Sequence, residues 1–420
     1  MYTRFTGEAM GISVSGMSGN ELFCLAAKNL SPGEIAVGNS VFSLGLGGAI
    51  SAFGQALAGG ELTQLSQLIS EGRHAAIQRM EEDARRVGAS GVTGVVSELR
   101  SLSGFTEFLS QGTTVHTPVP PSHLFSTSAS GTDLYCHLDA GYQPMRFAMG
   151  NVAYALGIGA GVSGMFRSLA RGEVHEFSQM YNQIRHTALA RLQAEAAQLG
   201  ANSVVDLKLR MLPMAGAIEL LITGTASYHP RFSQGPVRPE QVVTSELTGE
   251  ELWNLAQLGY APVRLVMATS VYSLGLTGSV GAMFKGMSRG EIPELTRLIY
   301  QARENCLELI RQEATHFGAE RVIGNKLMIQ DLGCGIIDVM AVGTAVRRLD
   351  GITPATPALI PQAVIVDRES VNLEGSLATS TPSANSLGTS RSGCLVALMV
   401  GVMTVAGIIM AIVAALMCQR

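Results

Sequence analysis

Three side chains on two short predicted helices could ligate a soft metal: Cys24, Cys136 and His137. Thiolate and imidazole are the ligands that zinc and heavier metals prefer, provided that they converge within about 2.0–2.3 Å of the ion. Cys136 and His137 are adjacent, and neighbouring side chains on a helix diverge by about 100°. The sequence therefore offers these residues as metal-ligand candidates without a complete ligand set.

The other cysteines fit other roles. Cys306 falls on the apolar face of a predicted helix, where a packed thiol is the usual explanation. Cys394 and Cys418 bracket a long apolar segment, and we interpret them as interfacial thiols open to acylation. None of the 6 cysteines, which include Cys334, lies in a C-x-x-C pair. We expect no disulfides, because the first residues do not resemble a secretory signal and a reducing compartment fits the chain.

Two sets of arginines could bind anions or carboxylates. Arg171 and Arg289 each precede the N-terminus of a predicted helix, which suits an anion site, although we favour a solvated rim. Arg73, Arg185 and Arg303 recur at one position of three predicted long helices, off the apolar face. We expect this second set to pair with carboxylates across a subunit contact.

No catalytic arrangement recurs along the chain. Residues 159–164 match G-x-G-x-x-G, but a dinucleotide fingerprint opens its helix at once, and here about 12 residues intervene. A glycine-rich, apolar connection packed against a neighbouring unit is the competing interpretation. No Ser-His-Asp, Cys-His or paired-carboxylate set repeats at fixed positions. We predict that the chain is not an enzyme and holds no cofactor, apart from a metal if one binds.

Composition excludes a nucleic-acid role and indicates several domains. The net charge is −4, and no Lys/Arg-rich run is interleaved with aromatic residues. Charged residues make up only 15% of the chain, against about 25% in typical soluble proteins. A chain of 420 residues is too long for one ordinary core, so two to four domains are expected.

The elements that must position these residues occur three times. The helix-start motif SGNELF at Ser18 returns as SGTDLY at Ser130 and as TGEELW at Thr248. The segment SVFSLGLG returns as VAYALGIG and SVYSLGLT, and a Gly-Thr pair closes each repeat. Such matches do not arise from composition. We predict three tandem domains, called copies 1, 2 and 3: residues 1–117, 118–232 and 233–349.

Each copy predicts the order α-β-α-β-β. A short helix begins with a Ser or Thr cap and an acid three residues on, the capping-box pattern. A β-rich run follows, and then a long helix whose apolar positions recur in steps of three and four. That helix ends at Gly88, Gly200 or Gly318, which suits a left-handed stop. Two alternating strands close the unit. The fold class is α/β (α+β), with a sheet backed by the long helix.

The C-terminal region predicts a membrane anchor on a tether. Residues 394–418 contain no charged side chain, and a helix of that length spans about 37 Å, enough to cross a bilayer core. Residues 350–392 are rich in Pro, Ser and Thr and predict a flexible linker, although residues 363–366 could add one strand. We expect a single-pass protein with a transmembrane helix at 393–418 and its body facing the cytoplasm.

The series GYAPVRLVMATSVYSLG, RGEI, QAREN, FGAERVIG and VGTAV in copy 3, with its counterparts in copies 1 and 2, resembles the YbjQ-like domain family. That family is labelled heavy-metal-binding. The resemblance implies a compact α/β domain that assembles into rings, pentameric for single-domain members, and it implies no defined reaction. Copy 1 departs most, because Gly59 stands where copies 2 and 3 have Arg171 and Arg289.

These observations favour a bacterial, tail-anchored scaffold or binding protein that forms a homo-oligomer. Its copies would tile into a ring or shell on the cytoplasmic face of the membrane. The expected partners are other copies of the chain and the lipid bilayer. The alternative is a membrane-tethered protein that binds or senses a heavy metal or small ligand. A third interpretation is an enzyme whose site forms only between subunits.

Overall fold

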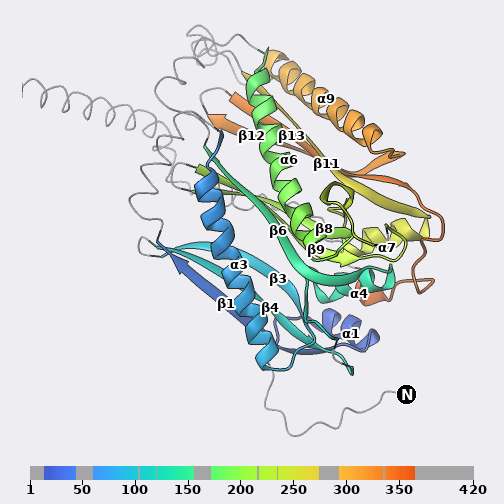
Figure 1. Cartoon of the computed structure of the whole chain (residues 1–420). Coiled ribbons are helices and arrows are strands. Elements are labelled where there is room, and N and C mark those ends of the chain that lie inside the picture. Colours follow the sequence, from blue (N-terminus) through green and yellow to red (C-terminus); the bar gives the residue numbers. More distant parts are fainter. Residues whose placement is uncertain are drawn as a thin grey trace, which may run out of the picture. The chain divides into compact units, whose positions relative to one another are not determined.

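The computed structural model describes residues 14–43, 60–102, 105–119, 121–155, 172–214, 217–233, 235–273, 293–333 and 336–364. Within these residues the three copies share a short helix, a long helix and three long strands in the same order (Figure 1). The mixed α/β fold, the tandem repetition and the order α-β-α-β-β that the sequence predicts are confirmed.

Each copy has one short helix, one long helix, three long strands and one or two strands of two residues. Copy 1 contains α1 (Gly19–Ala27), β1 (Ser31–Phe42), β2 (Gly60–Glu61), α3 (Thr63–Arg86), β3 (Gly91–Leu102) and β4 (Phe105–His116). Copy 2 contains β5 (Phe125–Ser126), α4 (Gly131–Asp139), β6 (Gln143–Ala155), β7 (Gly172–Glu173), α6 (His175–Gln198), β8 (Ser203–Met214) and β9 (Ala217–Tyr228). Copy 3 contains η1 (Pro239–Gln241), β10 (Val243–Thr244), α7 (Gly249–Gln257), β11 (Tyr260–Ser273), α9 (Pro293–His316), β12 (Arg321–Gly333) and β13 (Ile336–Arg348), and η2 (Pro361–Ala363) follows it.

The three long strands of each copy form an antiparallel sheet with the last strand in the middle. The orders are β1-β4-β3, β6-β9-β8 and β11-β13-β12. The last two strands of each copy pair as a hairpin, and the first strand joins the hairpin on its open side. The sequence predicts which segments are strands, whereas this order follows only from the structure.

The long helix of each copy packs on its own sheet through the predicted apolar stripe. In α3 the stripe residues Ile69, Ala76 and Met80 are fully buried. The helix backbone approaches the first strand closely at a glycine, because a Cβ on Gly38 would lie 2.1 Å from the carbonyl oxygen of Ala76. Gly150 occupies the same place beneath α6. Strand and helix therefore meet backbone to backbone in copies 1 and 2.

Neighbouring copies exchange short strands. The strand β2 of copy 1 pairs with β6 of copy 2, and β7 of copy 2 pairs with β11 of copy 3. In the opposite direction, β5 of copy 2 pairs with β3 of copy 1, and β10 of copy 3 pairs with β8 of copy 2. At each of the two junctions, each copy thus adds a short strand to the sheet of the other copy, and backbone hydrogen bonds hold the two together. The apolar core is continuous across the junction of copies 1 and 2 as well.

The short helices of all three copies gather in one apolar cluster with η2 (Figure 1). Trp253, Tyr135 and Tyr142 fill it, and Ala363 is buried against them. Residues 350–364 therefore differ from the flexible linker expected from Asp350 onward. Their Pro-rich composition resembles a tether, but Ile352 and Ala363 supply apolar side chains that are 3% and 2% exposed.

Several expectations fall on residues 365–420, which lie outside the described residues. They are the rest of the linker, residues 365 and 366 of the strand expected at 363–366, the two cysteines Cys394 and Cys418, and the transmembrane helix at 393–418. Ala363, the first residue of that expected strand, lies in η2 instead. Among the residues that the structure describes, no helix is long and apolar enough to span a membrane.

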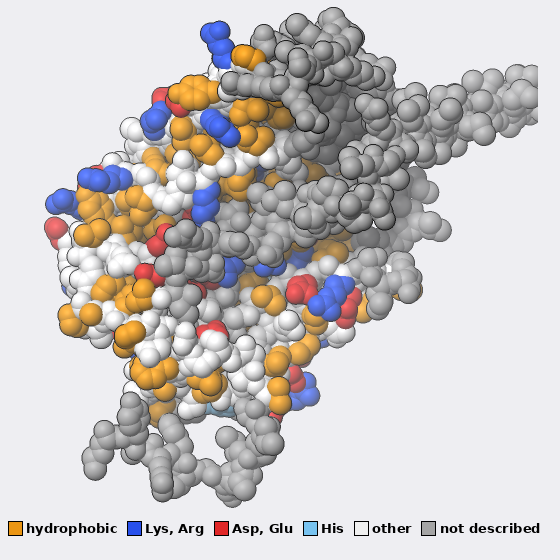
Figure 2. Space-filling model, turned by 180° about the vertical axis from the view of Figure 1, so that it is seen from behind, with side chains coloured by type: hydrophobic (Ala, Val, Ile, Leu, Met, Phe, Trp, Pro, Cys, Tyr) orange, Lys and Arg blue, Asp and Glu red, His pale blue; other side chains and the backbone are white. Residues whose placement is uncertain are grey.

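On the face seen in Figure 2, acidic and basic side chains are interspersed with apolar ones over the described part of the surface. This mixed surface agrees with the net charge of −4.

Candidate functional site

Where neighbouring copies meet, buried charged side chains pair across the junction. At the first junction the guanidinium of Arg73 is fully buried and forms a bidentate ion pair with Glu219 of copy 2. Arg73 Nε donates to Glu219 Oε1 at 3.0 Å and Nη2 donates to Oε2 at 2.7 Å. Nη1 donates to the hydroxyl of Ser97 at 3.0 Å. The fork of the arginine is thereby matched by acceptors on both sides.

Arg73 lies off the apolar stripe, as the sequence indicates, and is nevertheless buried. The reason is that α3 has a second covered face, which packs against β6 of copy 2. Asn151 on β6 donates its amide to Glu219 Oε1 at 3.4 Å. The carboxylate that receives Arg73 is therefore oriented by its own copy.

The second junction contains an ion pair at the same position, although Arg185 Nη1 is buried without a hydrogen-bond partner among the described residues. Arg185 of α6 is 2% exposed, and its Nη2 donates to Asp338 Oδ2 of copy 3 at 2.6 Å. Thr269 donates its hydroxyl to the other carboxylate oxygen. Both arginines in the recurring position thus pair with a carboxylate of the next copy, inside one chain.

Arg303, the third member of the set, lies exposed on α9 and forms no ion pair or hydrogen bond among the described residues. The carboxylate in the equivalent place of copy 1 is Glu107, which is partly exposed and accepts a hydrogen bond from Asn39 at 3.2 Å. Within the chain, Arg303 of copy 3 therefore has no carboxylate partner and Glu107 of copy 1 has no arginine partner among the described residues. The two lie in the last and the first copy.

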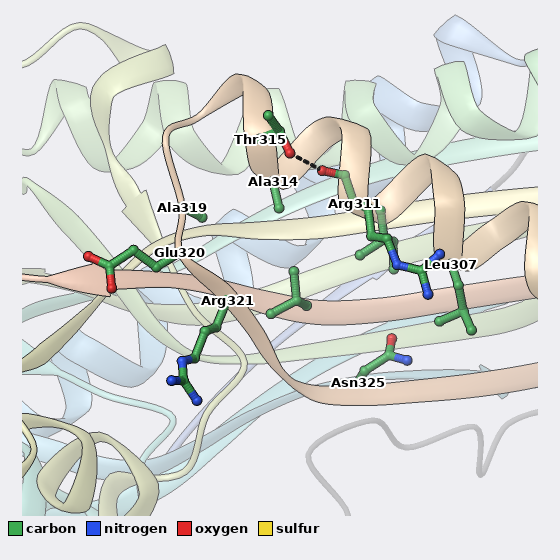
Figure 3. Close-up of a pocket in the computed structure, with 10 residues that line it drawn as sticks. Leu307, Arg311, Ala314, Thr315, Ala319, Glu320, Arg321 and Asn325 are labelled. Carbon is green, nitrogen blue, oxygen red and sulfur yellow. Dashed lines mark hydrogen bonds between the residues drawn. The ribbon is translucent and has the colours of Figure 1, made fainter.

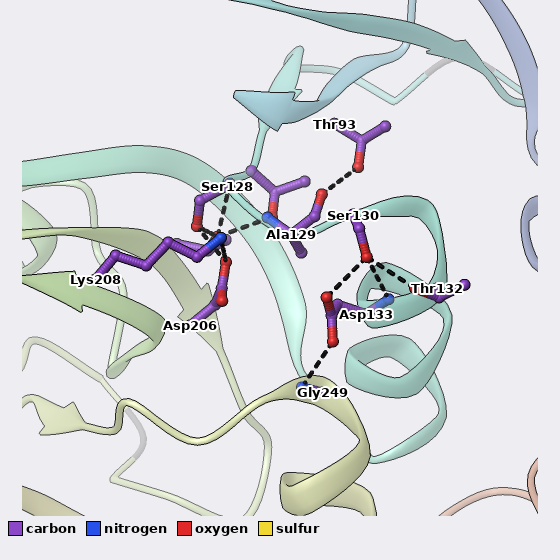
Figure 4. Close-up of polar contacts among 11 residues, drawn as sticks. Thr93, Ser128, Ala129, Ser130, Thr132, Asp133, Asp206, Lys208 and Gly249 are labelled. Carbon is purple, nitrogen blue, oxygen red and sulfur yellow. Dashed lines mark hydrogen bonds and ion pairs between the residues drawn. The ribbon is translucent and has the colours of Figure 1, made fainter. Parts of the chain in front are cut away.

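The short helices form a second layer of each junction. The backbone amide of Gly131, at the start of α4, donates to Glu21 Oε1 of copy 1 at 3.0 Å. Likewise Gly249, at the start of α7, donates to Asp133 Oδ1 of copy 2 at 3.0 Å (Figure 4). An acid in the first turn of one helix thus caps the next helix, where an anion is favoured by the helix dipole.

A buried polar cluster lies where copy 2 meets copy 1 (Figure 4). Ser128 donates to Asp206 Oδ2 at 2.7 Å, and Lys208 Nζ lies 3.4 Å from the same oxygen. Asp206 has a φ of 55°, whereas copies 1 and 3 have glycines, Gly94 and Gly324, in this left-handed position. Burial raises the pKa of Asp206.

Asp139 connects all three copies. It accepts hydrogen bonds from Lys28 of copy 1 at 2.5 Å, from the indole of Trp253 of copy 3 at 2.8 Å and from the hydroxyl of Thr356 at 2.6 Å. Burial opposes ionisation of Asp139, but these hydrogen bonds outweigh it and lower the pKa of the carboxyl. The ionised carboxylate of Asp139 therefore holds the short helices together through these hydrogen bonds.

The metal-ligand candidates lie in the same region without forming a metal site among the described residues. Cys24 and Cys136 are both buried in the apolar cluster of the short helices. Burial raises the pKa of Cys24 to about 11 and raises that of Cys136 as well. Burial of both thiols opposes formation of the thiolate, the form that ligates a metal.

His137 is 2% exposed, and its Nε2 has no hydrogen-bond partner among the described residues. Burial lowers its pKa. Within the described ranges no group of three or more His, Cys, Asp or Glu side chains could hold a metal ion. Among the described residues, Cys24, Cys136 and His137 therefore belong to no group of three or more potential metal ligands.

The remaining candidates divide between the core and the residues outside the described ranges. Cys306 is fully buried, and its thiol donates to the carbonyl oxygen of Val339 at 3.0 Å. Arg171 and Arg289, the anion or rim candidates, lie outside the described residues.

The carboxylates that pair with the buried arginines at the junctions are not among the candidates that the sequence predicts. A carboxylate recurs two residues into the last strand of copies 1, 2 and 3, as Glu107, Glu219 and Asp338. This recurrence parallels that of the arginines, so the sequence contains a signal that could have paired the two sets.

A family model described as "Putative heavy-metal-binding" matches the chain three times, over residues 30–118, 142–229 and 259–348. These matches cover well over half of the chain.

The chain belongs to the YbjQ family. Among its relatives, the encapsulin nanocompartment protein Rv1762c of Mycobacterium tuberculosis is 30% identical over 227 residues, which is 53% of this chain and 85% of that protein. A UPF0145 protein of Methanoregula boonei is 40% identical over 83 residues, or 20% of this chain and 69% of the relative. A UPF0145 protein of Thermotoga maritima is 38% identical over 78 residues, or 18% of this chain and 74% of the relative. No solved structure matches the chain. The resemblance to YbjQ-like domains seen in the sequence is thereby confirmed for the three copies.

Proposed function

We propose that this YbjQ-family chain is a non-catalytic scaffold or shell protein that assembles with other copies of itself. The observation that carries the proposal is its 30% identity to an encapsulin nanocompartment protein, over 85% of that protein's length. A nanocompartment is by its name an enclosure, and an enclosure requires subunits that bind one another.

The geometry of the junctions supports the same function. Copies meet through a heterologous contact, in which α3 or α6 of one copy meets the first strand of the next. A contact of this kind generates rings if it closes and open arrays if it does not. The buried ion pairs Arg73–Glu219 and Arg185–Asp338 give the contact a fixed register.

The test is the mass of the full-length protein, purified in detergent at micromolar concentration. We expect particles of several chains in mass photometry, with a repeating outline in negative-stain electron microscopy. A single species of 44.2 kDa at micromolar concentration would contradict the proposal.

We further propose that residues 393–418 anchor this scaffold to a membrane as a single helix, with the body on the cytoplasmic side. Support comes from the uncharged segment 394–418 in the sequence. The full-length chain should stay with membranes after an alkaline carbonate wash, and a chain that lacks residues 393–420 should be released. Equal release of both chains would contradict the anchor without touching self-assembly.

The family description makes metal binding the alternative, and the described residues do not favour it. Metal content after purification without chelators decides the matter. The alternative fails if Cys24→Ser and Cys136→Ser leave the metal content of the protein unchanged.

A further inference from the structure

We infer that chains join head to tail, with the exposed face of copy 3 of one chain receiving copy 1 of the next. The joint would repeat the contacts that connect copies 1 and 2 and copies 2 and 3. This inference rests on the proposed self-assembly and goes further, because it names the two surfaces, their order and the ion pair between them.

The face of copy 1 that would dock on copy 3 of the preceding chain is apolar and uncovered. Four of its large side chains are between 43% and 53% exposed, whereas their counterparts in copies 2 and 3 are at most 5% exposed because the preceding copy covers them. In copy 1 these side chains are Phe23, Ile35, Val37 and Val41; in copy 2 the counterparts are Tyr135, Phe147, Met149 and Ala153, and in copy 3 Trp253, Leu265, Met267 and Val271. Uncovered apolar surface of this kind marks an interaction site.

The opposite face, on copy 3, carries an open groove of about 440 Å³ between α9 and β12 (Figure 3). Its floor includes Leu307, Ile310 and Ala314. The counterparts of these residues in copy 2 are Leu189, Leu192 and Ala196, and all three are fully buried.

In copies 1 and 2 the equivalent groove is filled by the next copy. The strand β5 occupies it in copy 1 and β10 occupies it in copy 2, each pairing in parallel with the edge of the sheet. The segment of copy 1 that corresponds to β5 and β10 includes Val14, which is 66% exposed. The occupant of the groove on copy 3 is therefore this N-terminal segment of a second chain.

Opposite charges on copy 3 and copy 1 indicate that the partner of copy 3 is copy 1 of a second chain. Arg303 extends from the exposed face of copy 3, in the position where Arg73 and Arg185 each bind a carboxylate of the following copy. Glu107 of copy 1 is held by Asn39 in the way that Glu219 is held by Asn151. The structure thus contains a ready carboxylate at one end and a ready guanidinium at the other.

The glycines that begin the short helices give a second, independent match. A Cβ on Gly131 would lie 2.7 Å from Glu21 Cβ, and one on Gly249 would lie 2.7 Å from the carbonyl oxygen of Asp133. Gly19 occupies the same position in copy 1, yet nothing lies within 4 Å of its Cβ position.

The acid that would face Gly19 is Glu251 of a preceding chain. Its Oε2 already accepts from Thr248 N, and its Oε1 has no hydrogen-bond partner among the described residues. Glu21 shows that one carboxylate serves both purposes, because it accepts from Ser18 N and from Gly131 N at once.

One recurring contact would be absent from the joint between chains. His74 lies 3.3 Å from Glu195, and His186 lies 3.9 Å from Glu313 across the internal junctions. Copy 3 has Glu304 in the histidine position, which would face an acid of the next chain. The joint between chains would therefore lack one contact that both internal junctions have.

The test is a charge exchange in the full-length protein. Arg303→Glu and Glu107→Arg each place like charges across the joint, so each single variant should weaken association at least tenfold in mass photometry. A one-to-one mixture of the two variants should assemble again, because each chain supplies the charge that the other lacks. The double variant should also assemble.

Arg297→Glu is the matched control. It makes the same charge change on the same helix, at a position whose counterparts Gln67 and Gln179 are exposed in copies 1 and 2. This variant should assemble as the wild type does, and circular dichroism should show the same fold for every variant.

The outcomes separate the two proposals. If the wild type stays monomeric, the proposed self-assembly fails. If the wild type assembles and the two single variants assemble equally well, or if the mixture fails to recover, the head-to-tail joint is wrong and self-assembly by another surface stands.

Discussion

A guanidinium buried away from water is stable only where its charge and its donors are matched. Arg73 meets this condition with Glu219 and Ser97, whereas Arg303 in the same position of copy 3 remains hydrated. The difference between the two arginines comes from the following copy and not from their own helices. Their energetic roles should differ accordingly.

Removing the carboxylate of the first junction should destabilise the chain. Glu219→Gln leaves the charge of Arg73 buried without a counter-ion, which should lower the free energy of unfolding by about 3–5 kcal/mol. Urea unfolding followed by circular dichroism measures this change. Glu107→Gln, the partly exposed counterpart, is the control and should lower stability by less than about 1 kcal/mol in dilute, separated chains. Equal effects of the two changes would contradict the assigned role of Glu219.

A second carboxylate should make stability depend on pH. Glu246 is 1% exposed, and Lys326 Nζ lies 3.6 Å from its Oε2. Burial raises the pKa of Glu246 from 4.5 to about 7. The folded chain therefore binds a proton more tightly than the unfolded chain, and this group lowers stability progressively as pH rises from about 4.5 through 7, by on the order of 3 kcal/mol.

Glu246→Gln should remove that loss. The variant should match the wild type near pH 5 and be more stable than the wild type at pH 8, in urea unfolding at both pH values. Glu308→Gln, which alters an exposed carboxylate, is the control and should leave the pH dependence unchanged. A variant that is less stable than the wild type at pH 8 would show that Glu246 is held ionised by Lys326.

At the scale of elements, the short helices are spaced by glycine. Because Gly249 touches the backbone of Asp133, Gly249→Ala should push α7 away from α4 and destabilise the chain by about 1–3 kcal/mol. Gly19→Ala, where space is open, should change stability by less than about 0.5 kcal/mol. Thermal unfolding of dilute protein compares the two. If both changes are neutral, the helices are not in the contact described.

The helices and long strands could be predicted from the sequence because each has a residue pattern within its own segment. The buried stripe of α3, its end at Gly88 with φ of 68°, and the cap of α1 by Ser18 all agree with the predicted pattern. The two-residue strands were not predictable, because a strand of two residues has no period and is formed by pairing with another copy.

The candidate site was predictable only in part, for the same reason. The recurrence of Arg73 was visible, but the helical period places it off the apolar face, and only copy 2 explains why it is buried. Residue type alone makes Cys24 and Cys136 ligand candidates, whereas the packing of three short helices makes them core residues. Composition predicts that residues 350–364 belong to the tether, although they pack against Asp139 and its neighbours.

At the scale of the whole molecule, linking three copies makes two of the contacts intramolecular. A linked contact has a high effective concentration and persists on dilution, whereas a contact between chains does not. Dilution of the assembled protein to nanomolar concentration should therefore yield single chains of 44.2 kDa that stay fully folded. Mass photometry with circular dichroism checks this. Loss of structure in step with dissociation would show that the chain is not a stable unit by itself.

The terminal sheets have consequences for the chain before it finds a partner. Strand β1 of copy 1 lacks the short neighbour that β6 and β11 have, and β12 of copy 3 lacks the one that β3 and β8 have, within the described residues. An uncovered sheet edge with apolar side chains is a template for indiscriminate strand addition, including amyloid-like growth. Such a chain depends on rapid assembly with other copies of itself. Overproduction of a variant that cannot form the contact between chains should therefore lead to inclusion bodies and to binding by chaperones.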